Sequence, residues 1–153
     1  ALASGVRLIQ ATERQTGMQK TLEVSLPDDS PTIVVDHILT NHGLWPVETA
    51  PWGITELREG GVAICPQTDQ LDDADGVWPN RSIALWPFTR FDSEHIRWGD
   101  RFIFVTADMT DDTTDDTTES MLKFGFPNPI GWLAYHVDDT LFVMRADYDP
   151  AAT

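Results

Sequence analysis

The sequence is poor in cysteine, in lysine and in long apolar runs. Its one cysteine, Cys65, excludes an intrachain disulfide and a cysteine-based metal site, and its apolar neighbours predict a buried thiol. No apolar run approaches the ~20 residues that a membrane helix needs, so no membrane partner is expected. The N-terminus lacks the basic and apolar segments of a signal peptide. The missing signal peptide does not decide between a cytoplasmic protein and an exported protein whose leader has been removed.

Positive charge is scarce, with 10 Lys and Arg against 25 Asp and Glu and a formal net charge of -15. Such a charge repels phosphates, so nucleic acid is not an expected partner. The only lysines are Lys20 and Lys123. Acid-rich, lysine-poor surfaces suit concentrated salt, which screens the repulsion between like charges. The composition therefore favours a halophilic source, and an acidic protein from an ordinary organism is the alternative.

Helical periodicity is also lacking, whereas the two-residue alternation of β-strands recurs along the chain. Hairpins are predicted over 21–41 and over 131–145, the second with Asp138-Asp139 as a two-residue turn. A short helical turn capped by Asp92 or Ser93 is compatible with the region that follows Phe88. The predicted class is all-β, an antiparallel β-sandwich, and residues 1–153 have the length of a single domain. The expected strands cover residues 6–11, 21–26, 32–41, 82–86, 101–107, 122–126, 131–137 and 140–145, and residues 52–67 are expected to form a turn and a buried strand.

Residues 108–119 contain a tandem TDDT repeat and almost no apolar side chains. This segment cannot bury enough surface to offset its chain entropy, which predicts an exposed acidic loop. A calcium site is the alternative, but the glycine and glutamate spacing of an EF-hand loop is missing.

The polar stretch from Leu39 to Gln67 holds the first candidate site, the pair Asn41-His42 at the end of a predicted strand. A histidine beside an amide that can hold a hydroxyl can act as a general acid or base, and a histidine that bonds a loop carbonyl is the structural alternative. A metal site formed by His37, His42 and Glu48 is a second option. Positions 37 and 42 differ by an odd number, which places their side chains on opposite faces of one regular strand. No metal and no cofactor are therefore expected.

Six tryptophans form the next candidate set, because indole faces stack on sugar rings while nearby polar groups bind hydroxyls. Core packing is the alternative for each of them. Arg81 could clamp a carboxylate or a pair of hydroxyls, although an ion pair with Asp92 is the simpler interpretation. The resulting prediction is a site for a sugar or oligosaccharide with His42 as the catalytic candidate and, as substrate-binding candidates, Asn41, Trp45, Trp52, Asn80, Arg81, Trp86, Asp92 and Arg97.

Short motifs follow one another in a fixed order along residues 30–148. They are Leu39 to His42, Ala50 to Trp52, Gly60 to Ile64, Pro79 to Arg81, Leu85 to Phe88, Arg97 to Gly99 and Gly131 to Val143. In this order they resemble an uncharacterised family with the galactose mutarotase-like fold. The resemblance implies a large antiparallel supersandwich, or part of one, of the kind found in aldose 1-epimerases.

In aldose 1-epimerases, a histidine in a Thr-Asn-His context protonates the ring oxygen while a glutamate removes the anomeric proton. His42 matches part of that motif, but Gly43-Leu44-Trp45 replaces the sequence that usually follows. A second histidine in its His-Gly-Gly setting and the base glutamate are not found, which predicts a fragment, a shortened version or a binding domain without catalysis. The open strand edges of such a sandwich predict self-association. The alternative is a non-catalytic structural or assembly β-domain from a halophile.

Overall fold

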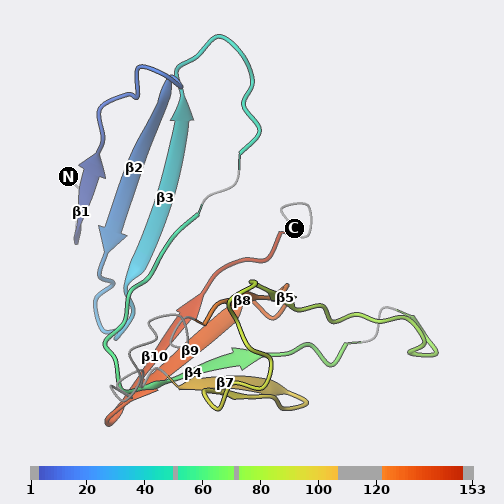
Figure 1. Ribbon diagram of the computed structural model, residues 1–153. Helices are drawn as coiled ribbons and strands as arrows, with labels where there is room; N and C mark the ends of the chain where they lie inside the picture. The colour runs from blue at the N-terminus through green and yellow to red at the C-terminus, as the bar shows by residue number, and fades with distance from the viewer. Residues whose placement is uncertain (1–3, 50–51, 71–72, 107–121, 150–153) are drawn as a thin grey trace. The chain divides into compact units, whose positions relative to one another are not determined.

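The computed structural model describes residues 4–49, 52–70, 73–106 and 122–149, which form two compact units, 1–54 and 55–153. Each unit is built from antiparallel β-sheets, and no helix occurs among the described residues (Figure 1). None of these residues therefore forms a helix that could cross a membrane. The all-β prediction is confirmed, while the single domain and the supersandwich stay predictions. The acidic loop predicted over 108–119 lies outside the described residues.

The first unit is a three-stranded sheet of β1 (Gly5–Ile9), β2 (Met18–Ser25) and β3 (Val34–Asn41), in which β2 is central. The predicted hairpin over 21–41 is confirmed, with Thr21 opposite Ile38. Register places Leu8, Leu22 and His37 in one row across the sheet. None of the described residues of this unit is fully buried, so its sheet has no closed core of its own.

The second unit contains a five-stranded sheet of order β10-β9-β4-β7-β6 and a two-stranded sheet of β5 and β8. The predicted two-residue turn at Asp138-Asp139 is confirmed, and Asp138 adopts a positive φ of 49° there. The strands are β4 (Val62–Pro66), β5 (Ala84–Leu85), β6 (Ile96–Arg97), β7 (Phe102–Thr106), β8 (Phe124–Gly125), β9 (Trp132–Val137) and β10 (Thr140–Arg145).

The core of the second unit lies between these two sheets. Cys65 and Ile103 are register partners on one face of the larger sheet, and Ile96 joins them from β6. Phe124, from the smaller sheet, packs against this cluster. The buried thiol predicted for Cys65 is therefore confirmed, and burial raises the pKa of that thiol to about 11.

The segment around Asp92 does not form the helical turn that the sequence allowed. The N–H of Ser93 donates to the Arg90 carbonyl, and the N–H of Ile96 donates to the Ser93 carbonyl, so single turns follow one another. The chain then pairs with β7 as the short strand β6. The apolar Ile96 side chain explains this outcome, because strand pairing places it in the core.

Candidate functional site

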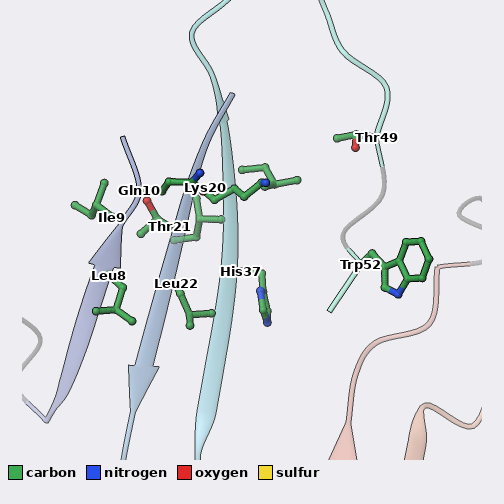
Figure 2. A pocket seen from close by; sticks show the side chains of 11 residues that line it. Leu8, Ile9, Gln10, Lys20, Thr21, Leu22, His37, Thr49 and Trp52 are labelled. Atoms are coloured by element: carbon green, nitrogen blue, oxygen red, sulfur yellow. The ribbon is translucent and has the colours of Figure 1, made fainter. Parts of the chain in front are cut away.

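The first unit carries a groove of about 700 Å³ on the face of its sheet that presents Leu8, Leu22 and His37 (Figure 2). Trp52 lies at the groove on the segment that follows β3. A Cβ built on Gly53 would lie 3.8 Å from His37 Nε2, so this segment runs close to the histidine. The groove is therefore lined by aliphatic side chains, a histidine and a tryptophan of one unit.

Lys20 lines the same groove, and its ammonium does not stand as an isolated charge. Lys20 Nζ lies 2.9 Å from Glu13 Oε1, and Thr16 Oγ1 donates to the other carboxylate oxygen of Glu13 at 2.9 Å. The hydrogen bond from Lys20 is the main reason that the pKa of Glu13 is lowered. Because the two charges compensate each other, this side of the groove offers hydrogen-bonding groups with little net charge.

His42, the catalytic candidate from the sequence, follows the last residue of β3 and does not line the groove. Its Nε2 lies 3.2 Å from Gln19 Oε1, and its backbone N–H donates to the Gly17 carbonyl at 2.9 Å. Alternation along the strand and this contact place His42 on the opposite face from His37. The histidine that the fold brings to the groove is therefore His37.

The side chain of Asn41 organises the turn that follows β3. Its Oδ1 accepts the N–H of Gly43 at 2.8 Å, and its Nδ2 donates to the Trp45 carbonyl at 2.8 Å. Trp45 is 78% exposed within this turn and does not line the groove. Of the residues of this unit that the sequence predicted for sugar binding or catalysis, only Trp52 lines the groove, and Asn41 instead stabilises a turn.

The other predicted aromatic and cationic residues belong to the second unit. Lys123 Nζ lies 4.2 Å from the ring centroid of Trp86, so the indole face already has a cation on it. The guanidinium of Arg97 lies 4.2 Å from the ring centroid of Phe104, its register partner on β7. Both contacts are local packing between neighbouring strands or segments.

The ion pair expected between Arg81 and Asp92 does not form. Arg81 Nη1 donates to the Asp100 carbonyl at 2.7 Å, whereas Asp92 accepts two hydrogen bonds of 3.1 Å from Arg90. The Arg90 guanidinium lowers the pKa of Asp92. The side-chain amide of Asn80 donates to the Gln70 carbonyl. Asp92 pairs with Arg90, which is two residues away, because closing a short loop costs less chain entropy than bringing a distant arginine to Asp92.

Across the part of the chain that the structure describes, no group of three His, Cys, Asp or Glu side chains could hold a metal ion. The set of His37, His42 and Glu48 is therefore not assembled, and the two histidines lie on opposite faces as the parity of their positions indicated.

Sequence reasoning considered His37 only as a metal ligand and did not consider Lys20. The sequence did contain a signal that both residues share one face of the sheet. The alternation of the two strands places residues 20, 22, 37 and 39 on one face once the hairpin is paired. Comparison with known proteins finds no family model, no curated protein and no solved structure that matches this chain.

Proposed function

We propose that the first unit binds a neutral carbohydrate in the groove beside Trp52. The observation that carries this proposal is that Trp52, which is 83% exposed, and His37 both line one groove of about 700 Å³. Small-molecule sites are concave and mostly apolar, with a few polar groups, and their volumes span ~300–1,000 Å³. The size and lining of this groove support a ligand of one or two sugar rings.

The charges favour a neutral ligand over an anionic one. Lys20 is paired with Glu13, so a bound anion would compete with that carboxylate for the ammonium. A hydroxyl group can instead accept a hydrogen bond from the ammonium without breaking the pair. An indole supplies the apolar surface that sugar ring faces need.

The proposal is limited to binding. Ring opening of an aldose needs an acid and a base, and no carboxylate is among the residues that line the groove. His42, for which epimerase chemistry was predicted, lies away from the groove beside Gln19. Isomerase activity stays a prediction from the resemblance.

The test is titration of glucose, galactose and their disaccharides, followed by tryptophan fluorescence and by isothermal calorimetry. Trp52→Ala should weaken binding about fivefold or more, because losing an aromatic contact costs about 1 kcal/mol or more. Trp45→Ala is the matched control, since Trp45 is similarly exposed in the same unit and lies outside the groove. Absence of calorimetric binding for every sugar, or equal losses in the two variants, would remove the proposal.

An assembly role is the second candidate function, and a separate observation favours it. The edge strand β10 of the second unit exposes four consecutive apolar residues, from Leu141 to Met144. This role uses the other unit of the chain and does not compete with the groove.

A further inference from the structure

We propose that two copies of this chain associate through β10, whose outer edges pair antiparallel about Phe142 to join the two five-stranded sheets. β10 is the last strand of its sheet and pairs only with β9 among the described residues. The exposed fractions of Leu141, Phe142, Val143 and Met144 are 57, 39, 40 and 39%. Exposed apolar edge strands are templates for pairing with another chain.

The hairpin determines which backbone groups of β10 point outward. Val137 and Thr140 close the two-residue turn and form a hydrogen-bonded pair, and bonded and non-bonded pairs alternate from there. The bond from the N–H of Ala146 to the Gly131 carbonyl continues the same alternation. The N–H and C=O groups of Leu141, Val143 and Arg145 therefore face away from β9, and none of the described residues hydrogen-bonds to them.

Charge identifies the partner as a second copy and fixes the register. Asp139, in the turn that precedes β10, and Arg145, the last residue of β10, lie three positions on either side of Phe142 in the sequence. Neither makes an ion pair with any residue that the structure describes. When Phe142 lies opposite its own symmetry mate, the turn that carries Asp139 in each copy lies beside Arg145 of the other.

The same register satisfies the remaining side chains and backbone groups. Leu141 of each copy lies opposite Val143 of the other, and these are the residues whose backbone groups face outward. The two Phe142 rings meet at the two-fold axis as a non-bonded pair, where opposing Cα atoms approach most closely.

The neighbouring symmetric registers place the charged residues less favourably. A shift that centres the pairing on Val143 places Asp139 opposite Asp147, and a shift that centres it on Leu141 places Asp139 opposite Val143. An edge contact of this size is small for a protein interface, so a micromolar dissociation constant is expected. The net charge of each copy opposes association at low salt, and concentrated salt screens this repulsion.

Sedimentation velocity in concentrated salt, over protein concentrations from about one to several hundred micromolar, tests the proposal. We expect a reversible dimer. Asp139→Arg places like charges opposite each other at two symmetric positions and should weaken association about tenfold or more, as should Arg145→Asp. The double variant with both substitutions restores opposite charges and should associate within about threefold of the unsubstituted chain.

Val143→Pro gives an independent test. The Val143 N–H faces away from β9, so proline leaves the hairpin ladder intact and removes a bond to the partner strand. Val143→Thr keeps that N–H and is the matched control. Circular dichroism establishes that each variant is folded. A chain that stays monomeric, or a dimer that withstands both Asp139→Arg and Val143→Pro, would overturn the proposal. So would a double charge variant that remains as weak as the single ones.

Discussion

Replacing Tyr135 by phenylalanine tests whether its hydroxyl stabilises the backbone that leads into β4. The Tyr135 hydroxyl accepts the N–H of Gly61 at 2.9 Å and donates to the Arg58 carbonyl at 2.5 Å. A Cβ on Gly61 would lie 2.5 Å from Tyr135 Cζ, so the backbone lies tightly against the ring. Tyr135→Phe keeps the ring and its packing and removes only these two hydrogen bonds.

The two partners should respond differently. Gly61 is buried, and leaving its N–H without an acceptor costs ~1–3 kcal/mol. Arg58 is exposed, so its carbonyl can bond to water at little cost. We therefore expect Tyr135→Phe to lower the free energy of unfolding by about 2 kcal/mol.

Urea unfolding in concentrated salt, followed by tryptophan fluorescence, measures this loss. Urea is preferable to guanidinium chloride because it leaves the salt concentration fixed. Tyr148→Phe is the matched control, since the chain has two tyrosines and Tyr148 is 36% exposed. Its effect should stay within ~0.5 kcal/mol. A loss below that level for Tyr135→Phe would refute the argument that this hydroxyl satisfies a buried donor.

Two further predictions concern the core of the second unit. Ile103 is 2% exposed and is packed between the two sheets, so Ile103→Ala should lower the free energy of unfolding in urea by ~2–5 kcal/mol. Ile130 is 43% exposed, so the control Ile130→Ala should lower it by less than ~1 kcal/mol. Similar losses for the two variants would show that Ile103 is not part of the core. The Cys65 thiol keeps its proton to a pKa of about 11, against about 9 when unfolded, so the folded state binds more protons in this window and stability should fall as pH rises through it. Cys65→Ala should remove that part of the decline, and an unchanged pH profile would show that the thiol does not contribute.

Much of the fold could be predicted from local patterns. The alternation in Trp132–Val137 and Thr140–Arg145, with Asp138-Asp139 between them, predicted the β9–β10 hairpin with its turn. The region around Asp92 gave no clear pattern because its single core residue, Ile96, sits in a two-residue strand. A strand that short is defined by its partner β7 and has no periodicity of its own.

The candidate site was less predictable because it depends on which faces and loops meet. The parity of positions 37 and 42 correctly separated the two histidines onto opposite faces. It could not indicate which face the segment at Trp52 would approach, since that segment is joined to β3 by a turn that Asn41 shapes. The Asn41-His42 pair predicted a catalytic or binding role, whereas in the structure the Asn41 side chain stabilises that turn through its hydrogen bonds.

The charges and the core together explain why association would matter to this chain. Most of the described ion pairs are largely exposed, and such pairs contribute little to stability, least of all in concentrated salt. Stability must therefore come mainly from apolar burial, and the fully buried apolar residues in the described part of the chain belong to the second unit. Pairing of two β10 strands would bury Leu141, Phe142 and Val143, which the single copy leaves exposed. Because this burial requires a second copy, it links the folding free energy of the second unit to protein concentration.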